Sequence, residues 1–90
     1  MNPTLLPGGD LIAAGLHDLQ GGLETIPSLL VSIGAPRLRR LGHAVPPLFP
    51  DPEHRLYALL AREHPAAAHS RYNALIRRLV SFERAAECGR

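Results

Sequence analysis

AAAHSRYNALIRRLVSFERAAE, residues 66–87, is the stretch of sequence that decides the fold. Its apolar side chains recur at intervals of four, three, four, three and four positions, which places them on one face of an α-helix. We call this set the apolar stripe; its members are Ala68, Tyr72, Leu75, Leu79, Phe82 and Ala86. The stretch therefore predicts a long C-terminal helix whose stripe is buried, either in the chain's own core or against a second chain.

Glu83 interrupts the apolar face of this predicted helix, because on a helical wheel it falls between Leu79 and Ile76. Glu63 occupies a similar position in the preceding helical segment. A carboxylate on a buried face must be protonated, paired with a cation or left wet near a helix end. The arginines available as partners are Arg37, Arg39, Arg40 and Arg55. Pairing across helices and escape to solvent both remain open at this point.

Two helices are predicted in the first half of the chain. Asp10 is a suitable N-cap for a helix through residue 20, in which Gly15 would permit close approach of a second helix. Thr25 begins the next helix, which is expected to end at Gly34. Pro36 then opens a separate short turn over residues 37–41, closed by Gly42.

The second half of the chain begins with a proline-rich connector over residues 43–50. The sequence Asp51-Pro52-Glu53 is a strong helix start, and Pro65 forces a boundary after Glu63. No segment alternates apolar and polar residues as a strand would. The predicted fold is all-α, a small bundle of four to five helices with a long C-terminal helix. Residues 1–9 are expected to form an N-terminal arm, and residues 10–90 a single helical domain.

Composition limits the class of protein. The chain has 90 residues, 46% hydrophobic and 20% charged, which is typical of one globular domain. No stretch approaches the roughly 18 apolar residues of a membrane span, so no membrane contact is expected. Cys88 is the one cysteine, which excludes an internal disulfide and favours a cytoplasmic location. A net charge of +2 does not by itself indicate nucleic-acid binding.

A protein–protein interface is the first functional hypothesis. The seam is predicted from Tyr72, Leu75, Leu79 and Phe82, with Arg71 and Arg78 flanking it and Glu83 as its irregular residue. Such an amphipathic helix favours a homodimer or a subunit that binds another protein. The expected function is that of a small helical interaction module without catalytic activity.

Nucleic-acid binding is the alternative. The arginines that would contact phosphates are Arg37, Arg39, Arg40, Arg77, Arg78 and Arg84. The predicted order of helix, glycine and short helix over residues 25–42 is also that of a helix-turn-helix, but a second helix of two turns is too short to fill a groove.

An enzyme or a small-ligand pocket is the third reading. The five histidines include no pair at the spacing of a helical metal site, and no nucleophile, phosphate loop or cofactor motif is present. The residues nominated for any chemistry are His64, His69 and Glu83. No catalytic residue, cofactor or metal is therefore predicted.

Overall fold

The computed structural model describes residues 5–88, which form four helices and no strand. The helices are α1 (Gly9–Gln20), α2 (Ile26–Arg40), α3 (Pro52–Glu63) and α4 (Ala68–Cys88). This confirms the predicted all-α bundle with a long C-terminal helix. No helix in the described part of the chain is long and apolar enough to cross a membrane.

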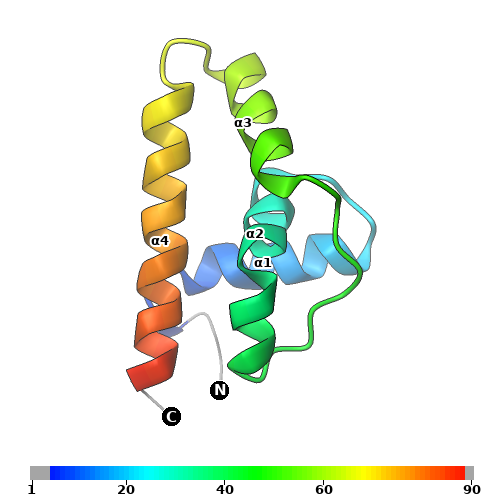
Figure 1. Cartoon of the computed structure of the whole chain (residues 1–90), viewed down its shortest axis with the longest axis vertical. Coiled ribbons are helices and arrows are strands. Elements are labelled where there is room, and N and C mark those ends of the chain that lie inside the picture. Colours follow the sequence, from blue (N-terminus) through cyan, green and yellow to red (C-terminus); the bar gives the residue numbers. More distant parts are fainter. Residues whose placement is uncertain (1–4, 89–90) are drawn as a thin grey trace.

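Helix α4 extends along most of the molecule, whose principal extents are 38 × 25 × 18 Å (Figure 1). The C-terminal part of α2 packs beside the C-terminal half of α4, where Gly34 lies against Leu79. Helix α3 packs beside the N-terminal half, where Tyr57 meets Tyr72. Helix α1 crosses behind and packs on α2 (Figure 1). Two shorter helices placed end to end therefore cover the long one.

Helix α2 is continuous, and the prediction that it ends at Gly34 is wrong. Pro36 lies inside the helix and is exposed to solvent, so its ring does not have to fit into the core. Leu38, in the turn after the proline, is fully buried, and its packing favours continuation over the loss of one backbone hydrogen bond. Because residues 37–41 are not a separate element, the helix-turn-helix order is absent.

The helix ends of α1 and α2 follow the same pattern. Gly42 has φ 99°, and the amide of His43 donates to the carbonyl of Leu38 while that of Gly42 donates to Arg39. Helix α1 ends in the same way at Gly22, with φ 71°. Both are Schellman motifs, which require a glycine in the left-handed conformation. The predicted stop at Gly42 is confirmed, but it ends α2 itself and not a separate short turn.

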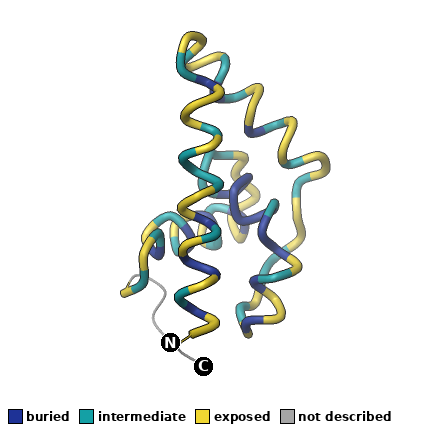
Figure 2. The backbone as a smooth tube through the Cα atoms, turned by 60° about the vertical axis from the view of Figure 1, so that its left-hand side comes forward, coloured by how far each residue is buried: buried dark blue, intermediate teal, exposed yellow. Residues whose placement is uncertain are grey.

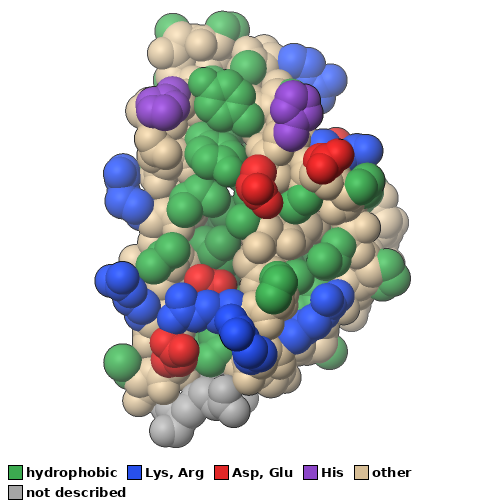
Figure 3. All heavy atoms as spheres, viewed as in Figure 1, with side chains coloured by type: hydrophobic (Ala, Val, Ile, Leu, Met, Phe, Trp, Pro, Cys, Tyr) green, Lys and Arg blue, Asp and Glu red, His purple; other side chains and the backbone are tan. Residues whose placement is uncertain are grey.

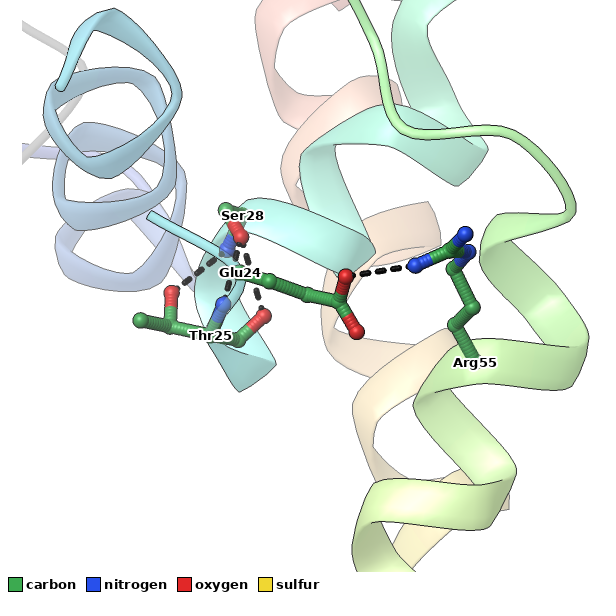
Figure 4. A network of polar contacts seen from close by, with 4 residues as sticks. All are labelled: Glu24, Thr25, Ser28 and Arg55. Carbon is green, nitrogen blue, oxygen red and sulfur yellow. Dashed lines mark hydrogen bonds and ion pairs between the residues drawn. The ribbon is translucent and has the colours of Figure 1, made fainter. Parts of the chain in front are cut away.

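Thr25 caps α2, as predicted. Its hydroxyl accepts a hydrogen bond from the amide of Ser28 at 3.1 Å, and its own amide donates to the Ser28 hydroxyl at 2.7 Å. The same threonine hydroxyl donates to Asp18 of α1, and Arg55 of α3 pairs with neighbouring Glu24 at 2.6 Å (Figure 4). The turn between α1 and α2 is thus tied to three helices.

Helix α1 starts one residue before the predicted N-cap. Gly8, with φ 72°, takes the N-cap position without a side-chain capping bond, and Asp10 lies in the first turn. A Cβ at Gly8 would lie 2.8 Å from the carbonyl oxygen of Arg78, so only glycine allows this approach of α4. Of the predicted arm, residues 1–4 lie outside the described residues, and Leu6 packs against the core.

Close approach at Gly15 is confirmed. A Cβ there would lie 2.4 Å from both the carbonyl oxygen of Pro27 and a methyl group of Val31. Helix α3 begins at Pro52 and ends at Glu63, as predicted, although the Asp51 side chain makes no capping hydrogen bond.

The core lies between α1, α2 and the C-terminal half of α4, and Leu56 and Leu60 of α3 complete it. Figure 2 shows buried positions gathered in α2 and in that half of α4, with half-buried and exposed positions in most of α3 and the start of α4. The fully buried large side chains include Ile12, Leu29, Leu30, Leu38, Leu56 and Phe82.

Candidate interaction surfaces

The apolar stripe is divided between the core and the surface. Leu79 is 4% exposed and Phe82 is fully buried, so these two of the four apolar seam residues lie in the chain's own core. Tyr72 and Leu75 are half-buried and pack against the edge of that core. Only the N-terminal part of the predicted seam is therefore accessible to a second molecule.

Tyr57 and Tyr72 form an aromatic pair across the α3–α4 hairpin. Their ring centroids lie 5.8 Å apart, and Tyr57 is 40% exposed. Burial raises the pKa of Tyr72, and the negative charge of Glu53 adds to this shift. Figure 3 shows hydrophobic side chains gathered in a band between α3 and α4, with histidines on both sides of its upper end. We call Tyr57, Tyr72 and Glu53 the tyrosine face.

Glu83 lies in a cavity between α2 and α4 and has an arginine partner from the same chain. It is 5% exposed, and its carboxylate lies 3.7 Å from the guanidinium of Arg37. Arg37 makes a closer pair, 2.6 Å, with Glu87. Burial raises the pKa of Glu83, while the positive charge of Arg37 acts in the opposite direction. Of the two alternatives left open, pairing across helices holds for Glu83, whereas Glu63 is exposed to solvent.

The walls of this cavity are mainly apolar, and its volume is about 300 Å³. The side chains around Glu83 and Arg37 come from α2 and α4: Ile33, Pro36, Arg40, Ile76, Leu79 and Val80. Its floor holds one carboxylate whose charge is already matched by Arg37. The cavity is therefore part of the contact between α2 and α4.

A second hollow of about 250 Å³ lies between α3, α4 and the start of α2. Its apolar lining is Ile26, Leu60, Ala74 and Leu75, and its polar lining is His64, Arg71 and Arg78. We call it the basic-rimmed groove. It brings together three residues of the predicted interface, Arg71, Leu75 and Arg78. Of the other four lining residues, Ala74 is also on α4, whereas Ile26, Leu60 and His64 come from α2 and from α3 and its C-terminal end, so no local sequence pattern identified the groove.

The charges of this groove are unevenly matched within the chain. Arg78 lies 3.5 Å from Asp10, and both side chains are at least half exposed. Arg71 is exposed and has no ion pair among residues 5–88. No acidic side chain lines the groove itself.

The six arginines of the nucleic-acid hypothesis do not share one face. Arg37 is engaged by Glu83 and Glu87, and Arg40 lines the same cavity. Arg39 makes a 3.5 Å contact with the carbonyl of Val45. Arg77 and Arg84 lie on the side of α4 opposite the apolar stripe, and Arg78 lies between these two faces.

His43 is a half-buried residue with a buried ring nitrogen, which sequence reasoning missed. Its ring lies 5.7 Å from that of Phe82, and its Nε2 atom has no hydrogen-bond partner among the described residues. Burial lowers its pKa. The proline-rich connector gave no signal of this burial, because the residue's position depends on how the connector folds over α4.

The remaining nominated residues lie apart. His64 lines the basic-rimmed groove, His69 contacts Asn73 on the exposed side of α4, and Cys88 is exposed at its end. Within residues 5–88 no group of three or more His, Cys, Asp or Glu side chains is placed to hold a metal ion. Comparison of the chain with protein-family models, curated proteins and solved structures gave no match.

Proposed function

We propose that the chain is a homodimeric helical interaction module without catalytic activity, located in the cytoplasm, whose α3–α4 hairpin packs against the hairpin of a second copy. One observation carries this proposal: the apolar stripe of α4 is longer than the part that the chain buries. Leu79 and Phe82 are in the core, whereas Tyr72 and Leu75 lie at its edge and remain half-buried.

The tyrosine face suits a contact between identical surfaces. Tyr57 and Tyr72 supply a large apolar area with few rotatable bonds, and their hydroxyl groups keep it compatible with water in the free chain. A two-fold interface places the same patch on both sides, so its charges must tolerate their own copies. Glu53 is close enough to Tyr72 to raise its pKa, and exposed His54 follows Glu53 in α3, which lets an acid of one copy face an imidazole of the other.

The experiment is light scattering on the chain and two variants at about 100 µM, well above the dissociation constant expected of a functional dimer. Tyr57→Arg places a charge in the proposed contact and should weaken self-association at least tenfold, leaving a monomer. Leu48→Arg is the matched control, since Leu48 is 38% exposed in the connector outside the hairpin. This control should keep the dimer mass. A dimer that survives Tyr57→Arg unchanged would place the contact elsewhere.

A further inference from the structure

We infer that the basic-rimmed groove binds an amphipathic helix from a different protein, one whose apolar face is bordered by carboxylates. The groove shares Leu75 with the half-buried part of the stripe but includes none of the three residues of the tyrosine face, and the inference does not depend on whether the chain is a dimer. It follows from three observations: the lining of the groove, the spacing of its two arginines, and the absence from this chain of two acidic residues at that same spacing.

The lining fits an apolar helix face. Ile26, Leu60 and Leu75 come from three different helices and meet at one hollow of about 250 Å³. Ala74 keeps the α4 wall low, so side chains of a bound helix can reach Leu75. Helix-in-groove recognition uses such a hollow to hold apolar residues at positions i, i+3, i+4 and i+7.

The charge at the rim is positive and is not neutralised within the groove. Arg71 has no ion pair among the described residues, and Arg78 has only the exposed contact of 3.5 Å with Asp10. The cavity on the other side of α4 is different, because there Arg37 contacts both Glu83 and Glu87. An incoming carboxylate therefore finds one guanidinium without an ion pair, that of Arg71, and one held only by an exposed 3.5 Å contact, that of Arg78, at the groove and not at the cavity.

The spacing of the rim indicates a helix. Arg71 and Arg78 are seven residues apart on α4, which corresponds to about 10.5 Å along its axis. Two carboxylates seven positions apart on a partner helix lying alongside α4 have the same separation and the same orientation. Each then reaches one arginine while the apolar residues between them contact the lining.

A second copy of this chain does not match that spacing. Its eight acidic residues are Asp10, Asp18, Glu24, Asp51, Glu53, Glu63, Glu83 and Glu87, and no two are seven positions apart. Glu83 and Glu87 are also engaged by Arg37. The occupant is therefore a different chain, recognised by paired carboxylates along one border of its apolar face.

The test uses a labelled, alanine-based helical peptide of about 15 residues, with leucines at i, i+3, i+4 and i+7 and two glutamates seven positions apart along one border. Two control peptides have the glutamates replaced by lysines, or the same composition in shuffled order. Fluorescence anisotropy should show that the chain binds the glutamate peptide at least tenfold more tightly than either control.

Paired charge reversals in the chain locate the binding site. Arg71→Glu with Arg78→Glu should weaken binding of the glutamate peptide at least tenfold and improve binding of the lysine peptide. Arg77→Glu with Arg84→Glu is the matched control, since it changes the net charge equally on the opposite side of the same helix. This control should change binding less than about twofold. If the glutamate variant loses its helical circular dichroism signal, Arg71→Gln with Arg78→Gln replaces it, and this variant should also weaken binding of the glutamate peptide.

Three results would overturn the inference. The first is equal weakening by both pairs of charge reversals, which would indicate attraction without a site. The second is equal binding of the shuffled peptide, which would mean that no helix face is recognised. The third is tighter binding of an oligonucleotide of equal charge, with a steep loss on adding salt, which would assign the arginines to phosphates. None of these results bears on whether the chain forms a dimer. The proposed function is therefore tested separately, by the mass of the chain in solution.

Discussion

At the scale of single residues, Glu83 and His43 are two titratable groups at the core whose pKa values are shifted by burial. Glu83 has Arg37 as a partner at 3.7 Å, a distance that leaves burial as the larger influence on its pKa. His43 has no partner for its Nε2 atom among the described residues. The charged form of each group therefore destabilises the folded state, but Glu83 is charged at high pH and His43 at low pH.

Glu83 should make the fold less stable as the pH rises. Its pKa is raised in the folded chain, so the folded state binds the proton more tightly than the unfolded state does. The stability that comes from this tighter proton binding is fully present below the ordinary pKa of a glutamate. It is lost as the pH rises through the raised pKa of Glu83 in the folded chain. Glu83→Gln should therefore increase the free energy of unfolding at pH 7 by about 1 kcal/mol, with a smaller gain at pH 4.

Urea unfolding of Glu83→Gln at both pH values measures this difference. Glu87→Gln is the matched control, because Glu87 binds the same arginine from a half-exposed position. It should change stability by less than the Glu83 variant does. A Glu83→Gln variant less stable than the parent at pH 7 would mean that the ion pair outweighs burial.

His43 should make the fold less stable as the pH falls. Burial lowers its pKa, so the folded state disfavours the proton that the unfolded state binds below about pH 6.5. The stability that comes from holding His43 neutral is fully present above the pKa of histidine in the unfolded chain. It is lost as the pH falls through the lowered pKa of His43 in the folded chain. His43→Leu, which removes the unpartnered nitrogen, should raise stability at pH 7 by about 1 kcal/mol and by more at pH 5.

Thermal unfolding at pH 7 and pH 5 tests this prediction, with exposed His54→Leu as the control. The parent chain and the control should lose the same stability between the two pH values, and His43→Leu should lose less. An equal loss in all three proteins would show that His43 does not carry the acid sensitivity.

At the scale of elements, the contact between α2 and α4 depends on a glycine inside a helix. A Cβ at Gly34 would lie 2.8 Å from a methyl group of Leu79 and 3.2 Å from a Glu83 carboxylate oxygen. Glycine is unfavourable in a helix by about 1 kcal/mol relative to alanine, so propensity alone would favour replacement. Here the close approach of two helices outweighs that preference.

Gly34→Ala should therefore destabilise the fold by about 1–3 kcal/mol, because Leu79 or α4 must move to admit the methyl group. Gly21→Ala is the control, since a Cβ there would meet its nearest neighbour at 3.6 Å, an ordinary contact. Chemical unfolding of both variants measures the effect. A Gly34→Ala variant as stable as the parent would show that α2 and α4 are not closely packed at this point.

The boundaries of the elements divide into those that local sequence determines and those that it does not. Thr25, Pro52 and Gly42 were predicted correctly because caps, prolines and left-handed glycines act through their immediate neighbours. The passage of α2 through Gly34 and Pro36 was not predicted. It depends on the burial of Leu38, a tertiary effect that outweighs the local signal to stop.

At the scale of the whole molecule, sequence identified α4 and its stripe but not which part of the stripe the chain covers. The helical spacing of Leu79 and Tyr72 is the same, yet Leu79 is packed beneath α2 and Tyr72 is at the edge beneath α3. The arginine partner of Glu83 was among four candidates, and only the fold selects Arg37. The basic-rimmed groove requires three helices to meet, so it could not be read from any one segment.

The central claim is that the half-buried part of the stripe, Tyr72 and Leu75, belongs to an interface between two copies. Sedimentation equilibrium of the unmodified chain, at about 10 and 200 µM and at low and high salt, tests it most directly. We predict twice the chain mass of 9.8 kDa at the higher concentration at both salts, because the contact is mainly apolar. A single-chain mass under all four conditions would contradict the claim and would mean that the stripe serves only the packing within one chain.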